Sequence, residues 1–297
     1  MTDLQRYLAE EIATDHADGL LTRREALRRL GLLGVGTLAA STLLTACEKE
    51  RATSPTAPGP TPTGDGAAAP ALATEAITFP GPEGRTLQGA WAGASAPRGA
   101  VLVLHENRGL TDHFRNVAGR FAAVGYSALA LDLLSEEGGT AALGDPANAT
   151  ATLGKIPPER FVADMKAALD ELARRTPGAK LGAIGFCFGG AMTWRLIASK
   201  DPRLAAAAPF YGPLPDGVDF TGSTAAVLAV YGELDARVNA SRDAAKAALE
   251  KAGLTYEIVT YPGADHAFFN DTGPRYNADA AAQAWTKVLA WFGRYLG

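Results

Sequence analysis

The chain has 297 residues, of which 47% are hydrophobic and 20% are charged, and its formal net charge is -4. This balance is ordinary for a globular protein and is enough for a substantial core. The weakly acidic charge, without a stripe of Lys and Arg in the body of the chain, excludes a dedicated nucleic-acid-binding protein. The 2 cysteines and 4 histidines are few enough that the sequence around each is informative.

The N-terminal part of the chain is typical of an export signal. Arg23 and Arg24 precede an apolar run, residues 30–46, which is diluted by glycines and is short for a membrane-spanning helix. Adjacent arginines before a weakly hydrophobic stretch are the pattern of a twin-arginine-type signal. The alternative is an amphipathic surface helix followed by an apolar hairpin. We favour export, because the segment is N-terminal and ends in a processing-type site.

That processing-type site is the tetrapeptide LTAC, residues 44–47, which resembles the bacterial lipobox. In a lipobox a peptidase cuts before the cysteine, and the cysteine is acylated. We therefore expect residues 1–46 to be a lipoprotein signal segment and Cys47 to carry a lipid that anchors the protein to the membrane. The protein would then be periplasmic or at the cell surface. The alternative is a soluble secreted protein, cut nearby at an ordinary small-residue site.

A stretch rich in Pro, Thr, Ala and Gly follows the lipobox-like site. Residues 48–74 lack aromatic side chains and have almost no large aliphatic ones, so they cannot bury enough apolar area to offset the entropy of ordering. We expect a disordered tether over residues 47–74 and one folded domain over residues 75–297. We also expect residues 1–74 to make few contacts with that domain, so that their removal leaves the melting temperature nearly unchanged.

Strands and helices alternate through the domain. Apolar runs such as 100–104 are expected for strands buried on both faces of a sheet, and the helical spacing of Phe161, Met165 and Leu169 predicts an amphipathic helix. Alternation of this kind predicts an α/β fold with a mostly parallel sheet covered on both faces by helices. We expect strands at 76–79, 88–93, 100–104, 127–131, 180–186, 205–210, 226–231 and 256–261, and helices at 116–125, 158–175, 189–199, 242–252 and 278–295.

The hexapeptide GFCFGG, residues 185–190, lies between a predicted strand and a predicted helix. This is the setting of the nucleophile elbow G-x-S-x-G, with Cys187 in place of serine. The elbow points its nucleophile at the N-terminus of the next helix, whose partial positive charge and free N–H groups stabilise a thiolate or an oxyanion. The alternative is a structural cysteine packed between Phe186 and Phe188. We favour a catalytic role because partner residues follow downstream.

These partners should follow in the order nucleophile, acid, histidine. Asp235 comes after the predicted strand 226–231 and is the candidate acid, with Glu233 a weaker one. His266 comes after the strand 256–261 and is the candidate base. Taken singly, a loop Asp often caps a helix and a loop His is usually solvated. Taken together, in this order and at the ends of successive strands, the two residues predict a triad with Cys187.

The loop after strand 100–104 is unusually polar. Its sequence HENRG, residues 105–109, follows a buried strand beside the expected site. In folds built around a nucleophile elbow, one oxyanion N–H comes from the residue after the nucleophile, here Phe188, and the second comes from this loop. The alternative is a solvated loop with an internal ion pair between Glu106 and Arg108.

The motifs at 105–109, 185–190, 231–235 and 265–268 together resemble the dienelactone hydrolase family of α/β-hydrolases, over essentially all of residues 75–297. The resemblance implies the α/β-hydrolase fold and a cysteine that attacks a lactone or ester carbonyl, with histidine and aspartate completing the triad. It also implies that Glu106 contacts the resting thiol and helps to deprotonate it when substrate arrives. Asn107 would give the second oxyanion N–H, and Arg108 would lie where it could activate the thiol or bind substrate.

The sequence departs from the family at one position. Dienelactone-cleaving members place an arginine four residues after the histidine to hold the substrate carboxylate, and this chain has Asn270 there. Arg275, Arg108 and Arg160 are the candidates to replace that arginine. Dienelactone is therefore not singled out as the substrate.

These observations predict a hydrolase that cleaves a small-molecule carboxylic ester or lactone through a Cys-His-Asp triad and an acyl-enzyme. We expect no metal and no organic cofactor, because metal-ligand spacing and a G-x-G-x-x-G motif after a strand are both lacking in the sequence. One alternative is thioester hydrolysis or acyl transfer at the same triad. Another is a non-catalytic cell-envelope binding module that keeps the fold.

Overall fold

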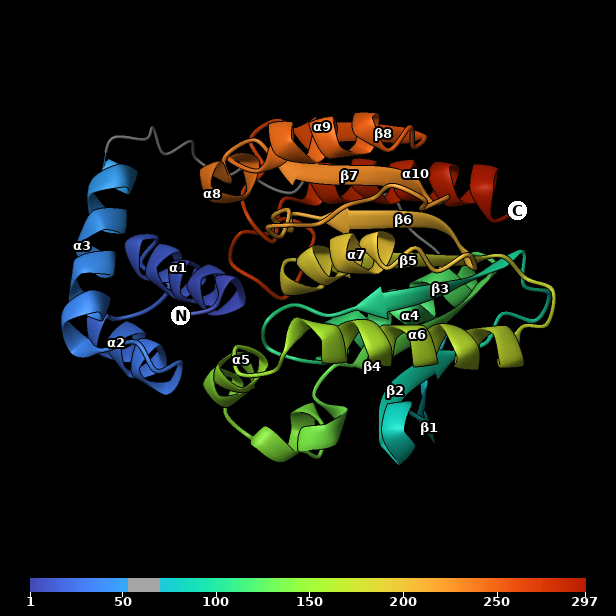
Figure 1. Ribbon diagram of the computed structural model, residues 1–297, viewed down its shortest axis with the longest axis horizontal. Helices are drawn as coiled ribbons and strands as arrows, with labels where there is room; N and C mark the ends of the chain where they lie inside the picture. The colour runs from blue at the N-terminus through green and yellow to red at the C-terminus, as the bar shows by residue number, and fades with distance from the viewer. Residues whose placement is uncertain (53–69) are drawn as a thin grey trace.

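The computed structural model describes the backbone of residues 1–52 and 70–297, and the side chains of residues 1–47 and 70–297. Its centre is an eight-stranded sheet in the order β1-β2-β4-β3-β5-β6-β7-β8 (Figure 1). β1 and β2 are antiparallel to their neighbours, and the remaining strands are parallel. The strands are β1 Glu75–Pro80, β2 Thr86–Ala92, β3 Gly99–Leu104, β4 Tyr126–Asp132, β5 Leu181–Phe186, β6 Leu204–Phe210, β7 Ala226–Gly232 and β8 Tyr256–Tyr261.

Helices cover both faces of this sheet, as the alternating pattern predicts. α6 and α7 lie on one face, and α4 and α10 lie on the other (Figure 1). β3, β4, β5 and β7 are buried along their whole length, which explains their continuous apolar runs. The expected α/β architecture is confirmed. The helices of the domain are α4 Asp112–Ala123, α5 Pro146–Leu153, α6 Pro158–Arg175, α7 Phe188–Ala198, α8 Ala236–Asn239, α9 Arg242–Lys251 and α10 Ala278–Tyr295.

Some elements differ from the expectation. α4 begins at Asp112, four residues before the predicted start at 116. The connection from β4 to α6 holds two short 3-10 helices, Ser135–Glu137 and Thr140–Leu143, and then α5, none of which the sequence analysis predicted. Asp145 caps α5 by accepting a hydrogen bond from the backbone N–H of Ala147, and proline follows it at the first helical position.

The expectation that residues 1–74 make few contacts with the domain is wrong for the described N-terminal helices. These are α1 Asp3–Ala17, α2 Arg23–Leu32 and α3 Thr37–Ala52. The first helix buries Leu4, Leu8 and Ile12 on one face. A Cβ placed on Gly154, after α5, would lie 3.3 Å from a methyl of Leu8, so the two segments are packed together. Removal of α1 should therefore change the stability of the protein, contrary to that expectation.

α1 lies beyond the carboxyl ends of the parallel strands (Figure 1). α2 is joined to α5 by an ion pair of 2.8 Å between Arg28 and Asp145. Most of the predicted tether, residues 53–69, lies outside the described residues. Within the described part, α3 continues through Cys47 to Ala52, where the sequence predicted an extended segment from residue 47. No helix in residues 1–52 or 70–297 is long and apolar enough to cross a membrane. The export signal and the lipid at Cys47 stay predictions.

Candidate active site

Cys187 lies in a sharp turn between β5 and α7. Its backbone has φ 54° and ψ -115°, a conformation that L-residues rarely adopt. Its N–H donates to the carbonyl of Phe210 at 3.0 Å, and its carbonyl accepts from the N–H of Ala191 at 3.1 Å. These bonds hold the turn, so that the thiol lies at the carboxyl end of the sheet and at the start of an 11-residue helix.

The glycines around Cys187 are required by close approach of the backbone. A Cβ on Gly185 would lie 2.1 Å from the carbonyl oxygen of Gly189. A Cβ on Gly189 would lie 2.4 Å from the carbonyl oxygen of Leu104 and 2.7 Å from that of His105. Any side chain at these positions would therefore push α7 away from β5 and from the end of β3. This is the physical reason for the glycines of the elbow.

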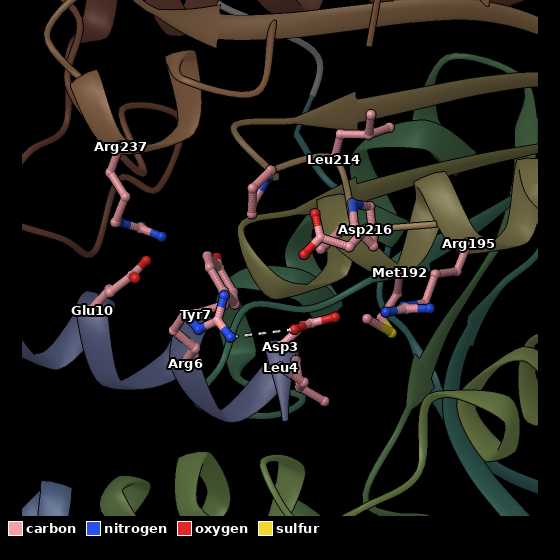
Figure 2. Close-up of a pocket in the computed structure, with 13 residues that line it drawn as sticks. Asp3, Leu4, Arg6, Tyr7, Glu10, Met192, Arg195, Leu214, Asp216 and Arg237 are labelled. Carbon is pink, nitrogen blue, oxygen red and sulfur yellow. Dashed lines mark ion pairs between the residues drawn. The ribbon is translucent and has the colours of Figure 1, made fainter. Parts of the chain in front are cut away.

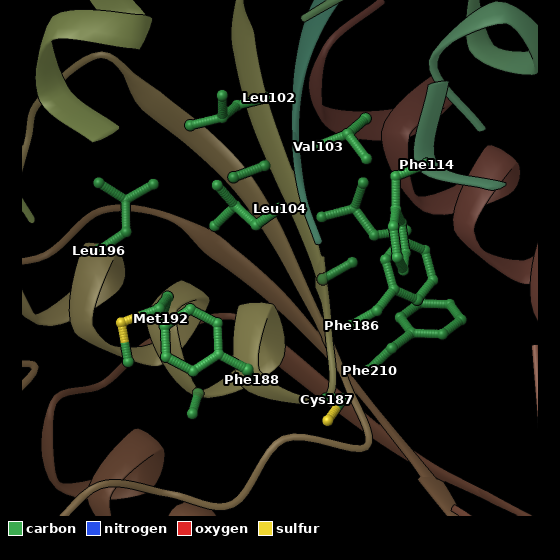
Figure 3. Packing of buried hydrophobic residues seen from close by; sticks show 14 of the residues in the cluster. Leu102, Val103, Leu104, Phe114, Phe186, Cys187, Phe188, Met192, Leu196 and Phe210 are labelled. Carbon is green, nitrogen blue, oxygen red and sulfur yellow. The ribbon is translucent and has the colours of Figure 1, made fainter. Parts of the chain in front are cut away.

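The two phenylalanines of the elbow anchor it on opposite sides of the sheet. Phe186 packs against Phe114 of α4, with ring centroids 5.6 Å apart, and Phe188 packs against Phe161 of α6 at 5.3 Å. Figure 3 shows the two rings pointing away from each other, with Cys187 at the turn between them. Cys187 is thus not packed between the two rings, which disfavours the alternative that it is only a structural core residue.

Asp235 follows β7, His266 follows β8, and their side chains are in direct contact. Oδ2 of Asp235 lies 2.5 Å from Nδ1 of His266, and Oδ1 accepts from the N–H of Val238 at 3.1 Å. The cap on α8 therefore fixes the carboxylate that orients the imidazole. Sγ of Cys187, a ring nitrogen of His266 and a carboxylate oxygen of Glu11 lie within 4.8 Å of one another. Glu233, the weaker acid candidate, instead accepts from the N–H of Gly263 at 2.8 Å.

The carboxylate of Glu11 raises the pKa of both His266 and Cys187. Burial opposes a charge on His266, but the carboxylates of Glu11 and Asp235 raise its pKa well above the ordinary value. Burial raises the pKa of the Cys187 thiol, and the negative charge of Glu11 raises it further. The described arrangement thus favours a protonated imidazole and a neutral thiol.

Glu106 is buried beside this group. The sequence suggested that it contacts either the thiol or Arg108, and its described bonds are to other residues. Oε1 accepts from the hydroxyl of Tyr211 at 3.3 Å, and Oε2 accepts from the side-chain amide of Asn270 at 2.9 Å. Burial raises the pKa of Glu106, and the Asn270 hydrogen bond partly opposes this shift. Arg108 is exposed to solvent, and no ion pair joins it to Glu106 among the described side chains.

The remaining residues of the 105–109 loop support its shape. Nδ1 of His105 lies 2.7 Å from the carbonyl of Glu106, while Nε2 accepts from the N–H of Leu133 at 3.1 Å. His105 therefore carries its proton on Nδ1 and is neutral, in line with a pKa that burial lowers. The carbonyl of Asn107 accepts from the hydroxyl of Thr150 at 3.0 Å. The use of the Asn107 and Phe188 N–H groups as oxyanion donors stays a prediction.

The arginines that could replace the missing family arginine are placed differently. Arg275 pairs with two carboxylates at the C-terminal end of α1: its Nη2 lies 2.9 Å from Asp15, and its Nε lies 2.9 Å from Asp18, the residue that follows the helix. Arg160 is held by Glu137 at 2.7 Å, in the connection that leads to α6. Arg275 is therefore occupied within the chain, and Arg160 is committed to a structural ion pair.

Three functional neighbours escaped the sequence analysis. The hydroxyl of Tyr7 lies 3.1 Å from Sγ of Cys187, and Oε1 of Glu11 lies 3.1 Å from Nε2 of His266. The other oxygen of Glu11 pairs with Arg237, which belongs to α8. The signal was present in the sequence: Thr2 and Gln5 form a capping box at the start of α1, and a helical apolar stripe follows.

Glu11, Cys187 and His266 form the only group with metal-ligand spacing found in the described part of the chain. The sulfur, imidazole and carboxylate would be a chemically suitable donor set for Zn²⁺. Among the described side chains, Oε1 of Glu11 lies 3.1 Å from Nε2 of His266 and 3.8 Å from Sγ of Cys187, so the three groups already pair through charge. We therefore assign these atoms to acid–base and thiol chemistry.

A cavity of about 230 Å³ lies between α1 and α7, next to this group. Its walls include Tyr7, Met192, Arg195, Leu214 and Arg237 (Figure 2). It is smaller than most pockets that enclose a small molecule, which have volumes of roughly 300–1,000 Å³. α1 forms one wall of the cavity, and its Tyr7 lies between the cavity and Cys187, 3.1 Å from Sγ.

Comparison with known proteins agrees with this geometry. The model of the dienelactone hydrolase family matches residues 87–296. A predicted carboxymethylenebutenolidase of Salmonella typhimurium is 33% identical over 262 residues, which are 83% of this chain and 95% of that protein. A second one, from Escherichia coli O157:H7, is 34% identical over 217 residues, 69% of this chain and 80% of the relative.

Solved structures give the same result. A predicted dienelactone hydrolase from Klebsiella pneumoniae superposes with a TM-score of 0.65 at 31% identity, covering 75% of this chain and 100% of its own. A dienelactone hydrolase-like promiscuous phosphotriesterase from metagenomic libraries superposes with a TM-score of 0.64 at 29% identity, covering 76% of this chain and 100% of its own. The chain therefore belongs to the dienelactone hydrolase family and is a hydrolase that acts on lactones or esters.

Proposed function

We propose that the protein hydrolyses a carboxylic ester or lactone through a triad of Cys187, His266 and Asp235. The observation that carries this proposal is the 2.5 Å contact between Asp235 and His266, on the same side of the sheet as a thiol held in an elbow turn. A nucleophile, a base within reach and an acid that orients the base are the three parts that covalent acyl transfer needs.

In the proposed reaction, His266 acts in its neutral form: the imidazole takes the proton of the Cys187 thiol, and the thiolate attacks the carbonyl carbon. The tetrahedral oxyanion accepts hydrogen bonds from the backbone N–H groups of Phe188 and Asn107. His266 then gives its proton to the departing alkoxide, which leaves as an alcohol or, for a lactone, stays attached to the acyl group. Water, deprotonated by His266, cleaves the thioester and regenerates the thiol.

Glu106 is proposed to regulate the charge of the thiol. Its buried carboxylate disfavours a second negative charge nearby, which keeps Cys187 protonated in the resting enzyme. The two donors on Glu106, from Tyr211 and Asn270, hold that carboxylate in place. Arg108 is exposed and does not share in this network, so we leave it as a candidate for substrate binding only.

Two other functions use the same residues. Thioester hydrolysis or acyl transfer would differ in the leaving group or in the acceptor that replaces water. A non-catalytic binding module would have no need for a strained cysteine beside an oriented imidazole. For the substrate, Asn270 stands where an arginine would bind a carboxylate, and it is engaged by Glu106. We therefore propose esters or lactones without choosing dienelactone itself.

We also propose that residues 1–46 direct export and that Cys47 is acylated, which would place the protein at the periplasmic or outer side of a membrane. The support is the exposure of Arg23 and Arg24 in the first turn of α2. Positive charges there oppose the helix dipole, so helix stability does not account for them. Detection of a lipid-modified Cys47 in the membrane fraction by mass spectrometry would test this proposal.

The nucleophile is tested by a pair of cysteine variants in the full chain. Cys187→Ala should reduce kcat/KM on a panel of aryl esters and lactones by at least about a thousandfold. Cys47→Ala should leave it unchanged, because Cys47 lies on α3 and is not part of the group around His266. Retention of more than about 1% of the activity by Cys187→Ala would rule out the triad.

A further inference from the structure

α1 lies directly over the proposed reaction site. The hydroxyl of Tyr7 is 3.1 Å from Sγ of Cys187, and Oε1 of Glu11 is 3.8 Å from the same sulfur and 3.1 Å from Nε2 of His266. Cys187 and His266 are only 2% and 3% exposed. An ester carbonyl must reach contact distance of Sγ in order to react. Substrate and α1 therefore cannot occupy this position at the same time.

The side chains from α1 also oppose the chemistry electrostatically. The carboxylate of Glu11 lies between His266 and Arg237, so it holds an anion next to the reacting atoms. The guanidinium of Arg237 lies 4.8 Å from the centre of the Tyr7 ring, which fixes both side chains of α1 over the thiol. A negative charge beside Cys187 disfavours the thiolate. α1 thus blocks access and suppresses the nucleophile with the same residues.

A second set of contacts holds α1 at its other end. Asp15 and Asp18 both pair with Arg275, which lies in the segment between β8 and α10. These carboxylates lie one and two helical turns beyond Glu11, and both form ion pairs with Arg275. They form a latch that can be opened without touching the reacting groups.

The contacts between α1 and the active-site loops are of a kind that can be broken. The side chains of α1 that bond across to the active-site loops are polar: Tyr7, Glu11, Asp15 and Asp18. The cavity between α1 and α7 shows that α1 does not fill the space before it. Figure 2 shows α1 along one side of this cavity, with Tyr7 and Glu10 facing Arg237. The apolar face of α1 also packs against the domain, near α5, so its displacement has a cost in free energy. Over the active site itself, polar bonds beside a cavity open more readily than an apolar core.

We propose that α1 is an intramolecular inhibitor, which keeps the hydrolase latent while it is docked and releases the active site when it leaves. The inhibitor is a defined segment of this chain, Asp3–Ala17, and it acts by occupying the substrate position with Tyr7 and Glu11. This inference rests on the proposed function, because it requires Cys187 to be the nucleophile. The activity of the full chain would then be set by the fraction of molecules in which α1 is displaced.

The direct test removes the blocking side chains from the full-length protein. In Tyr7→Ala/Glu11→Ala, the rate at which iodoacetamide modifies Cys187, followed by peptide mass spectrometry, should rise by about tenfold or more. Turnover of p-nitrophenyl acetate should rise with it. Thr14→Ala is the matched control on the same helix, since Thr14 takes no part in these contacts, and it should change neither rate. Melting curves establish that each variant is folded.

The remote test opens the latch without altering the groups around the thiol. Asp15→Asn/Asp18→Asn should also raise the modification rate of Cys187, although less than the first variant. Asp112→Asn/Asp243→Asn removes two exposed carboxylates outside α1 and should have no effect. Unchanged modification of Cys187 in both α1 variants would overturn the proposal. So would a fall in turnover at unchanged modification, because it would make Glu11 part of the catalytic machinery.

The same measurements separate this inference from the proposed function. If modification of Cys187 rises in the α1 variants but none of them turns over esters or lactones, then α1 does shield the thiol and the assignment as a cysteine hydrolase fails. If ester turnover persists in Cys187→Ala, the nucleophile is wrong whatever the state of α1. Faster modification together with faster turnover supports both.

Discussion

The side-chain amide of Asn270 donates a 2.9 Å hydrogen bond to the carboxylate of Glu106. This contact changes the meaning of the asparagine at a position where dienelactone-cleaving members of the family have an arginine. An arginine would supply a positive charge for a substrate carboxylate. Asn270 instead supplies a neutral donor that is already used by Glu106, so the site around Cys187 lacks a permanent cation from this position.

Glu106→Gln should lower the pKa of Cys187, because it removes a buried negative charge that disfavours the thiolate. Turnover should fall at the same time, since the carboxylate could no longer influence the thiol during the reaction. Ultraviolet thiolate absorbance against pH, in a Cys47→Ala background, measures the first effect. Glu75→Gln, at an exposed glutamate of β1, is the control. Overlapping titration curves for Glu106→Gln and wild type would exclude a role for the charge of Glu106.

Asp235→Asn should leave the fold intact and reduce kcat by about 10²–10⁴, because the amide no longer fixes the tautomer and charge of His266. Burial opposes ionisation of Asp235, but the charge of His266 lowers its pKa, so it is a carboxylate in the resting site. Asp243→Asn, at an exposed position of α9, should keep full activity. Steady-state kinetics with an aryl ester would decide, and equal kcat values for the two variants would contradict the assignment.

Gly189→Ala should reduce the free energy of unfolding by about 1–3 kcal/mol, the usual effect of overpacking. The new methyl would lie 2.4 Å from the carbonyl oxygen of Leu104, so α7 would have to shift and the elbow would be distorted. Gly31→Ala is a suitable control, because nothing lies within 4 Å of its Cβ position in α2. Urea unfolding should show a loss only for Gly189→Ala, and an equal stability of both variants would contradict the close approach.

The ion pairs of Glu11 predict a specific pH dependence. Burial would raise the pKa of Glu11, but the charges of His266 and Arg237 lower it well below its ordinary value of 4.5. A carboxylate with a depressed pKa stabilises the folded state above its unfolded pKa, and this contribution disappears as the pH falls through the folded pKa. Glu11→Gln should therefore reduce the free energy of unfolding by about 3 kcal/mol at neutral pH.

This difference in unfolding free energy between Glu11→Gln and wild type should shrink steadily below about pH 4.5. Urea titrations of both proteins at several pH values measure it. Thr14→Ala, which changes no charge, should show a difference that does not depend on pH. A constant difference for Glu11→Gln down to strong acid would mean that its carboxylate is not held by these cations.

The sheet and its helices were predictable because their signals are local. β8 and the helices α6 and α10 have the bounds that the sequence predicts, since apolar spacing, prolines and glycines mark both ends. α5 and the 3-10 turns before it were missed because residues 133–157 show no clear periodicity. The only local sign was the pair Asp145 and Pro146, which caps α5.

The residues of the candidate site also fall into two groups, those with a local sequence signal and those without one. Cys187, Asp235 and His266 could be found because each follows a strand in a recognisable order. Tyr7 could not be found, because it contacts Cys187, which lies 180 residues away in sequence. Arg237 could not be found, because its contact with Tyr7 depends on where α1 docks. The apolar stripe of α1 was visible, but the position of the segment before two arginines led to the interpretation that it was only a leader.

α1 and the predicted lipobox occur on one continuous segment, with Cys47 at its end. A single peptide-bond cleavage before Cys47 would separate residues 1–46, and with them both the export address and the helix that covers Cys187. Activation would then be irreversible and would occur once per molecule. It would coincide with arrival at the membrane, so that esters inside the producing cell would meet only the small open fraction of uncleaved molecules.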